Sequence, residues 1–599
     1  MTTSSIDSAA APKKKNGHAP DPDNVPTLQS LGVQLDPDTL HYVENPEALA
    51  NALGGNGVKD VFSNPVVLSA AACACLGGLL FGFDQGILSI VLTMKQFLTQ
   101  FPETDKDANS KAGLNKGVMT GLLELGAFIG AIISGFFADR YSRKASIVFG
   151  SVWFVIGSVI QSAAYQFPTL VVGRFIGGIG IGILSSTAPM YISEIAPPNV
   201  RGSFLVLEAA SIVFGIVVMF YITYGTRHMS GDWAFRVPFI VQMAPCVGLA
   251  ALLWSLPYSP RWLAQVGRDE ESLDSLARLR RLPKTSPLVQ AEWISIRAEA
   301  IRNRDVLVTA HPSLQGGDFK SEVKLEVAAW VDMFKPGVIK RTMIGVMLMF
   351  FQQMTGINAL IYYSPTLFEQ LGLDYEMQIT LSGVLNVAQF VAVVMAFLLL
   401  DKVGRRPPLI YGAFLIAASH FIVAAMIGVY SKDWAAHPTQ AWVGVAFLFA
   451  FMIFYGVGWA PVPWTMPAEV HSSSRRAKGV AITTCTNWFF NFIIGLITPP
   501  FLQSAPYGTF IFFGAFGLLG GIWAIFIAPE TKGKTLEEVD KLFHNNAAAD
   551  EDRAKQMIIT SICAGAPYQP SWAVGDAANG DTLDKIDGGK NVQVWVEKA

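Results

Sequence analysis

Charge is scarce in this chain of 599 residues. Lys, Arg, Asp and Glu together make up 15% of it, whereas hydrophobic residues make up 51% and the mean hydropathy is +0.39. An ordinary soluble protein carries about 25% charged residues. The formal net charge is −2, so no nucleic-acid partner is expected. The composition is typical of a protein embedded in a lipid bilayer.

Cysteine is also rare, and the usual signs of an enzyme are missing. The five cysteines have no metal-ligand spacing, and no nucleophile–base pair or phosphate-binding loop stands out. Cys73 and Cys75 are interpreted as small apolar residues of a membrane helix. We therefore expect no enzymatic activity, no metal and no cofactor.

Long apolar runs, in contrast, are plentiful. A bilayer core needs about 20 apolar residues per helix. Because lipid leaves backbone groups no outside partner, such runs are predicted to be helical. Twelve transmembrane helices are predicted, over residues 66–93, 117–138, 145–164, 169–191, 203–224, 236–256, 342–370, 376–400, 408–430, 440–467, 479–503 and 508–528.

The apolar runs fall into two groups of six, with polar segments between and around them. No apolar core of a signal peptide precedes Val66, and the polar C-terminal tail is expected to be partly disordered. Basic residues collect in alternate loops, so the positive-inside rule places both termini and the central segment in the cytoplasm. The expected domains are an N-terminal tail (1–65), a six-helix bundle (66–256), a central loop with short helices (257–341), a second six-helix bundle (342–528) and a C-terminal tail (529–599).

Charge patterns at the cytoplasmic helix ends recur in the two groups at nearly one offset. This recurrence predicts two parallel repeats with a substrate site between them near the membrane midplane. The acids and arginines can pair across helices and act as a gating network; the alternative is that the basic residues only fix topology, which requires no acid. The residues of this predicted network are Asp139, Arg140, Arg143, Glu194, Arg201, Asp401, Arg405, Glu469 and Arg476.

Seven motifs, in order, carry a family resemblance. The motifs are "GxxxDRxxRK" (135–144), "GRFIGGIGIG" (173–182), "PMYISEIAPPNVRG" (189–202), "FQQMTGINALIYYSP" (351–365), "DKVGRR" (401–406), "VPWTMPAE" (462–469) and "PETKG" (529–533). Through these motifs the chain resembles, between about residue 66 and 540, the sugar porter family of the major facilitator superfamily, most closely its fungal hexose transporters. The resemblance implies an all-α membrane protein of 12 helices in two six-helix bundles.

The resemblance also implies a set of sugar-contacting residues. Amide side chains both donate and accept hydrogen bonds without a charge to desolvate, and an aromatic face suits the C–H surface of a sugar. The alternative is that the amides only tie helices together. The implied contacts are Gln352, Gln353, Asn358, Tyr362, Asn386, Trp464, Asn491 and Phe81; Trp488 is a further aromatic beside Asn491.

Helix breaks are expected around Gly356 and Pro365 and in the Gly- and Pro-rich tenth span, as gates or as static kinks.

Two positions depart from the family pattern. Ala209 replaces a sugar-contacting Gln, which leaves the cargo open, and Tyr258 replaces a Glu of the cytoplasmic charge network.

Asp84 lies in an apolar run with no other charge, where an ionised side chain costs at least a few kcal/mol. The resemblance implies that Asp84 pairs with Arg174 and exchanges a proton during transport; the alternative is a static ion pair. Glu124 and Glu208 are further intramembrane acids without an implied role, for which Arg140 and Arg174 are candidate partners.

The expected function is transport of a monosaccharide, a hexose such as glucose, by alternating access with proton symport through Asp84 and Arg174. A facilitative uniporter, a pentose, polyol or quinate carrier, and a sugar sensor that does not transport stay open. The expected partners are the sugar, protons and the lipid bilayer. The expected location is the plasma membrane, where the multi-pass chain acts as a monomer.

Overall fold

The computed structural model describes residues 35–53, 65–197, 201–314, 319–534, 536–543 and 547–564, together with Leu31 and Val33. Within this part of the chain, twelve helical spans are long and apolar enough to cross a membrane. The predicted all-α fold and the predicted number of spans are therefore confirmed. The predictions agree with the structure because the length and hydropathy of a span are local properties of the sequence.

Six spans precede the central segment and six follow it, and several of them are split. The first six are α4 (Pro65–Val91), α6 (Ala112–Tyr141), α7 (Arg143–Ala163), α8 (Phe167–Ile195), α9 (Arg201–Thr226) and the pair α10 (Trp233–Val241) with α11 (Met243–Ser255). The last six are α16 (Ile339–Met354) with α17 (Ile357–Glu369), α18 (Tyr375–Val403), α19 (Arg406–Tyr430), α20 (Pro438–Gly458) with α21 (Val462–Val470), α22 (Arg476–Ser504) and α23 (Pro506–Phe526).

Shorter helices lie outside the spans. The central segment forms α12 (Pro260–Gln265), α13 (Asp269–Arg280), α14 (Pro287–Ala310) and α15 (Phe319–Asp332). The remaining helices are α1 (Pro37–Glu44), α2 (Pro46–Leu53), α5 (Lys95–Gln100), α24 (Leu536–Leu542) and α25 (Ala547–Cys563), with short 3₁₀ turns at Pro102–Thr104 and Pro312–Leu314.

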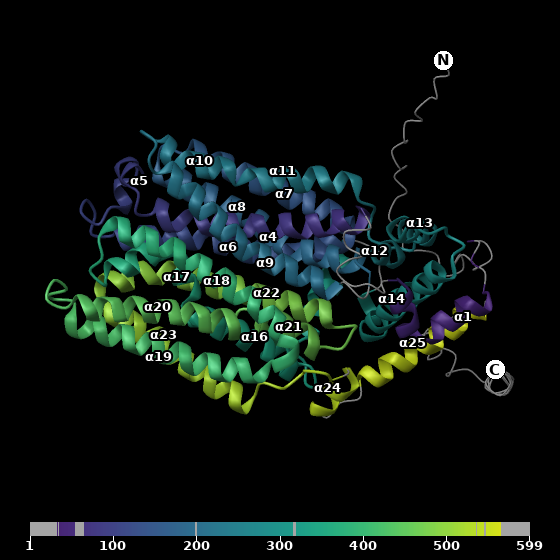
Figure 1. Ribbon diagram of the computed structural model, residues 1–599. Helices are drawn as coiled ribbons and strands as arrows, with labels where there is room; N and C mark the ends of the chain where they lie inside the picture. Colours follow the sequence, from purple (N-terminus) through teal and green to yellow (C-terminus); the bar gives the residue numbers. More distant parts are fainter. Residues whose placement is uncertain are drawn as a thin grey trace, which may run out of the picture.

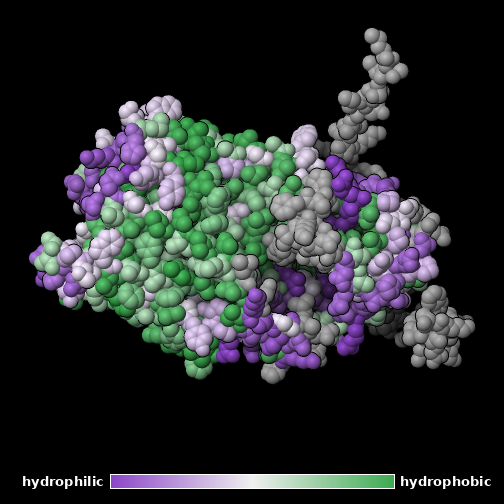
Figure 2. Space-filling view, viewed as in Figure 1, coloured by the Kyte–Doolittle hydropathy of each residue, from purple (hydrophilic) through white to green (hydrophobic). Residues whose placement is uncertain are grey.

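The long helices lie side by side in one bundle (Figure 1). Helices α12, α13, α14, α24 and α25 gather at one end, which we call the proximal end; the opposite end, with α5, is the distal end. Figure 2 shows a broad hydrophobic surface between the more polar ends. Trp254 is 92% exposed and Phe526 80% exposed on the bundle. Such exposure is typical of a surface that faces lipid.

The two groups of six helices meet along several helices, and two of these contacts are equivalent. Helix α6 packs against α22, and α18 packs against α9; the internal repeat exchanges these two pairs. Glycines permit the first contact, because a Cβ added to Gly117 would lie 2.2 Å from the carbonyl oxygen of Leu496. Small residues at such crossings allow close helix packing in membranes. Polar groups on α6 and α22 are thereby brought together.

Two spans are broken where the sequence predicts breaks. Gly356 separates α16 from α17 with φ of +83°, and within α17 Tyr363 has non-helical angles. In the tenth span, α20 ends at Gly458 and α21 begins at Val462. The predicted breaks are confirmed. They matter because residues on either side of Gly356 can face one another instead of following a single helical register.

The tails hold more structure than their polar composition suggests. Helices α1, α2 and α25 pack against α14 at the proximal end. Ile558 and Ile562 of α25 share a buried apolar cluster with Trp293 of α14 and Leu276 of α13. The spacing of these isoleucines, one helical turn apart, is the signal in the sequence. The predictions for 1–30 and 565–599 fall outside the described residues.

Replacing Gly356 by Ala should destabilise the protein more than replacing Gly337. Both glycines have positive φ (+83° and +90°), which costs an L-residue about 1–2 kcal/mol. A Cβ on Gly356 would also lie 2.7 Å from the ring of Phe513, whereas a Cβ on Gly337 meets nothing within 4 Å. Thermal unfolding of the purified protein in detergent should show the larger loss for Gly356→Ala. Equal losses would contradict a role for this contact.

Candidate functional site

An ion pair between α4 and α8 lies deep in the bundle. Asp84 Oδ1 and Arg174 Nη1 are 2.7 Å apart, and the side chains are 1% and 0% exposed. Arg174 Nε also donates to the carbonyl oxygen of Met119 (3.3 Å). Among the described residues, Asp84 Oδ2 and Arg174 Nη2 have no hydrogen-bond partner. The structure thus brings the predicted pair together through a single hydrogen bond.

A second buried acid lies where the two halves meet. The hydroxyl of Tyr362 on α17 donates to Glu124 Oε1 (2.6 Å), and Asn491 Nδ2 on α22 donates to Glu124 Oε2 (3.0 Å). Gln85 Nε2 on α4 donates to the Tyr362 hydroxyl (3.1 Å). Neither Arg140 nor Arg174 is a hydrogen-bond or ion-pair partner of Glu124 among the described residues. Sequence reasoning missed this arrangement, whose signal is the lone Glu in an apolar helix.

Three amide side chains form a chain of hydrogen bonds next to the break at Gly356. Asn358 Nδ2 donates to Gln353 Oε1 (2.6 Å), and Gln353 Nε2 donates to Asn487 Oδ1 (2.6 Å). Gln352 instead donates to the carbonyl oxygen of Trp459, at the break in the tenth span (2.9 Å). The break lets Gln353 at the end of α16 meet Asn358 at the start of α17.

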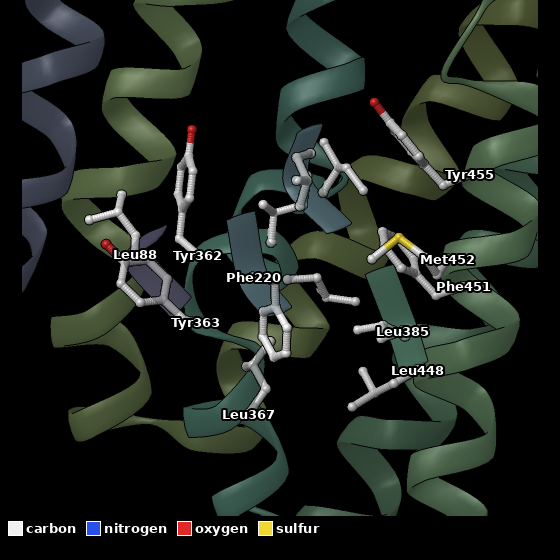
Figure 3. Packing of buried hydrophobic residues seen from close by; sticks show 14 of the residues in the cluster. Leu88, Phe220, Tyr362, Tyr363, Leu367, Leu385, Leu448, Phe451, Met452 and Tyr455 are labelled. Carbon is white, nitrogen blue, oxygen red and sulfur yellow. The ribbon is translucent and has the colours of Figure 1, made fainter. Parts of the chain in front are cut away.

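The acid and the amide chain belong to one polar strip. Asn358 and Tyr362 are four residues apart on α17, and Asn487 and Asn491 are four residues apart on α22. Residues at this spacing share a helix face. The surroundings are apolar: Figure 3 shows Tyr362 among the buried hydrophobic residues of its cluster. The strip is therefore a polar line inside a hydrophobic interface between the halves.

The remaining predicted contacts differ in their surroundings. Both polar atoms of Asn386 on α18 are buried and have no hydrogen-bond partner in the described part of the chain. Buried amides without partners are costly, so this position suits a polar ligand. Trp464 on α21 is 39% exposed. Phe81 lies with its ring centroid 4.8 Å from that of the buried Trp488.

A charge cluster joins three helix ends in the N-terminal half. Arg143 Nη2 lies 3.0 Å from Glu194 Oε1, and Arg143 Nη1 lies 2.8 Å from Asp139 Oδ1. The hydroxyl of Ser259 donates to the carboxylate of Glu194. All of these groups lie near the proximal end, where the indole of Trp262 on α12 donates to the carbonyl oxygen of Asp139.

The C-terminal half repeats this cluster at equivalent positions. Arg405 Nη2 lies 2.9 Å from Glu469 Oε1, and the hydroxyl of Thr531 donates to Glu469. Each Glu thus pairs with the Arg of the preceding charged loop. Within the described residues no ion pair joins Glu469 to Arg476. The side chains of Arg201 and Asp401 lie outside the described part of the chain.

Connections with the central segment complete the cluster. Arg140 pairs with Glu322 of α15. Lys478 of α22 pairs with Glu326 of α15, whose other partner is the indole of Trp330 (3.0 Å). Lys478 Nζ also lies 3.8 Å from Asp139 Oδ2 of the N-terminal half. Helix α15 therefore carries acids that reach basic residues of both halves.

The charge cluster of the N-terminal half has Tyr258 at the position where the family pattern has a Glu, so its contacts differ from those of the C-terminal cluster. Lys144 Nζ lies 5.0 Å from the centroid of the Tyr258 ring, a cation–π contact. In the C-terminal half the family's acid is retained as Glu530, which accepts from the backbone N–H groups of Arg405 and Arg406 (3.0 Å each). Burial raises the pKa of Glu530, but the backbone hydrogen bonds outweigh it and hold the pKa below its usual value.

Comparisons with known proteins show which proteins have a similar sequence. A family model described as "Sugar (and other) transporter" matches residues 70–543. The high-affinity glucose transporter of Kluyveromyces lactis is 33% identical over 491 residues, which cover 80% of this chain and 85% of that protein. The sugar transporter STL1 of Saccharomyces cerevisiae is 33% identical over 527 residues, which cover 86% and 87% of the two chains.

Solved structures agree with the sequence relatives. The proton:xylose symporter XylE, a major facilitator superfamily protein solved with 6-bromo-6-deoxy-D-glucose, matches with a TM-score of 0.63 and 27% identity over 80% of this chain and 99% of that chain. A partially occluded, inward-open structure of XylE from E. coli matches with a TM-score of 0.63 and 25% identity, over 79% of this chain and 100% of that chain.

Replacing Asp84 by Asn should destabilise the protein by about 3–5 kcal/mol, because Arg174 is left charged and buried without its partner. Asp232→Asn is the matched control. Asp232 pairs with Arg236 at 3.3 Å but is 41% exposed, and exposed pairs contribute about 0–1 kcal/mol. Thermal unfolding in detergent measures both changes. A loss for Asp84→Asn no larger than that of the control would contradict the buried ion pair.

Proposed function

The chain belongs to the sugar transporter family of the major facilitator superfamily, and from that premise we propose that it carries a hexose such as glucose in symport with protons. The proteins to which it is similar are transporters rather than enzymes. Two named relatives transport glucose or sugar, and a structural neighbour is a proton:xylose symporter. The multi-pass membrane architecture suits this function.

The observation that carries the proposal of proton coupling is the buried pair of Asp84 and Arg174. A buried carboxylate stays ionised only while an opposite charge or hydrogen-bond donors stabilise it, and for Asp84 that stabilisation comes from Arg174. Separation of the pair would leave Asp84 buried and uncompensated, and a proton would then neutralise it. The pair is joined by a single hydrogen bond, and Asp84 Oδ2 and Arg174 Nη2 have no partner among the described residues. Proton uptake and release at Asp84 would thereby accompany a change in packing between α4 and α8.

The polar strip between the halves supports sugar binding. Gln353, Asn358 and Asn487 offer both donors and acceptors in an apolar interface. A sugar hydroxyl also donates and accepts, so it can exchange with each of these amide bonds. Asn386 adds buried polar atoms without protein partners among the described residues. We assign Gln352, Phe81 and Trp464 to the same sugar site.

Alternating access requires ion pairs between the halves to break, and such pairs are present at both ends of the bundle. At the distal end the halves are joined by Lys106 with Glu369 and by Arg227 with Glu376 (2.6 Å for the second pair). Trp464, in the helix that runs toward the proximal end, is partly exposed. This arrangement is consistent with a carrier closed at its distal end. Opening of the distal end requires these two ion pairs to break.

We further propose that the proximal end faces the cytoplasm and that the carrier acts in the plasma membrane. The loops and short helices at that end are rich in Arg and Lys, as the positive-inside rule requires. The charge clusters around Glu194 and Glu469 would then hold the cytoplasmic helix ends of each half. One chain contains both halves of the site, so a monomer suffices for transport.

Uptake of labelled glucose should separate symport from facilitated diffusion. In cells without hexose carriers of their own, the wild type should concentrate glucose and a protonophore should abolish the accumulation. Asp84→Asn should retain sugar exchange but lose accumulation, because the proton site is gone. The double variant Asp84→Asn/Arg174→Gln removes both charges, so that neither is left uncompensated. Glu208→Gln, a buried acid outside the pair, is the control and should still accumulate glucose. Wild-type uptake that only equilibrates would make the protein a uniporter.

Replacing Gln353 by Ala should raise the KM for glucose by roughly 10- to 100-fold. The change removes one hydrogen bond and leaves Asn358 and Asn487 without their buried partner, at about 1–3 kcal/mol. Gln161→Ala is the matched control, since Gln161 is a buried amide of α7 that donates to the carbonyl oxygen of Gly173 (3.3 Å). Initial rates against glucose concentration give both KM values. Similar KM values for the two variants would remove Gln353 from the sugar site.

A further inference from the structure

Glu124 is a buried acid for which the proposed mechanism has no use. It is 0% exposed, at the level of the polar strip. No ion pair within the described residues includes Glu124. The charged groups that act on it are Asp84 and Arg174, which already pair with each other. Its direct contacts are neutral: the hydroxyl of Tyr362 and the amide of Asn491.

The hydrogen bonds indicate how Glu124 is used. Tyr362 has one hydroxyl hydrogen, and its short bond to Glu124 (2.6 Å) accounts for that hydrogen, while Gln85 donates to the same oxygen. Asn491 uses an N–H on the other carboxylate oxygen. Both oxygens of Glu124 thus accept a hydrogen bond from the C-terminal half. Each carboxyl oxygen has a further acceptor position, so the group can accept from further donors.

The position of Glu124 connects it with the substrate. Its two protein donors, Tyr362 and Asn491, come from the C-terminal half and lie on the polar strip proposed to bind sugar. Glu124 itself comes from α6 of the N-terminal half, and α6 packs closely against α22. A group in this position can reach whatever the C-terminal strip binds. Hydrogen bonds to a charged acceptor are about twice as strong as neutral ones, so this contact would carry much of the selectivity.

We propose that Glu124 is a substrate-binding residue through which the N-terminal half contacts the sugar, its carboxylate accepting a hydrogen bond from a substrate hydroxyl. The inference rests on the proposed function and specifies its cargo. A carboxylate at this point favours neutral polyhydroxylated compounds. It disfavours anionic compounds such as sugar acids or quinate, because like charges repel at short range in a site shielded from water.

The competing explanation is that Glu124 only braces α6 against α17 and α22. A brace would change stability, and it would weaken the binding of every sugar by the same factor. A direct contact, in contrast, predicts a loss that depends on one substrate hydroxyl. Deoxy-sugars therefore distinguish the two explanations.

The experiment measures inhibition of labelled glucose uptake by 2-, 3-, 4- and 6-deoxyglucose, for the wild type, Glu124→Gln and Glu208→Gln. In the wild type, at least one deoxy analogue should bind roughly 10- to 100-fold more weakly than glucose, the range for a hydrogen bond to a charged group. In Glu124→Gln, glucose itself should weaken by a similar factor, and that analogue should weaken no further. Glu208→Gln should keep the wild-type pattern, because among the described residues no hydrogen bond joins this buried acid of α9 to the polar strip.

Other outcomes overturn the inference. Equal weakening of glucose and of all four analogues in Glu124→Gln would identify a brace, and unchanged affinities would remove Glu124 from the site. If Glu124→Gln does not reach the membrane, Glu124→Asp keeps the charge, withdraws it by one methylene and should give the same analogue pattern. A wild type that takes up no glucose would overturn the proposed function itself, whereas the failures above leave glucose transport intact.

Discussion

Polar groups at membrane depth must find their partners inside the protein, and the organisation of this carrier follows from that constraint. Water would cheaply satisfy an isolated amide or acid at a soluble surface, but lipid cannot. Each buried polar side chain therefore determines which helices lie against which. Asp84 ties α4 to α8, Gln353 ties α16 to α22, and Glu124 ties α6 to α17 and α22. The contacts that hold the bundle together are also the ones that a polar cargo can exchange with.

The two buried acids at the centre of the bundle, Asp84 and Glu124, have different kinds of partner. Asp84 has a cation, Arg174, and the pair is confined to the N-terminal half. Glu124 has neutral donors, Tyr362 and Asn491, and they come from the C-terminal half. A pair within one half can respond to a proton without separating the halves. A carboxylate held by donors of the opposite half is placed to respond to what lies between the halves, which is why we assign proton coupling to Asp84 and sugar contact to Glu124.

Duplication explains the charge clusters but does not make them identical. Arg143 with Glu194 and Arg405 with Glu469 are equivalent pairs, each completed by a hydroxyl donor. The difference lies at Tyr258, where a cation–π contact with Lys144 stands in the position of the acid that the other half keeps. The two halves therefore hold these helix ends by different kinds of contact.

The sequence by itself determined what depends on short stretches of chain: twelve apolar spans, the break at Gly356, the repeat of the charged loops and the family. Length, hydropathy and glycine conformation are local, so they can be read without knowing the neighbours. It also named most of the polar residues of the site, through their motifs. Only the tertiary structure decided the partners. That Glu124 binds Tyr362 and Asn491, and that Glu194 pairs with Arg143, depends on which helix faces come together, because residues far apart in the chain meet only when the helices pack.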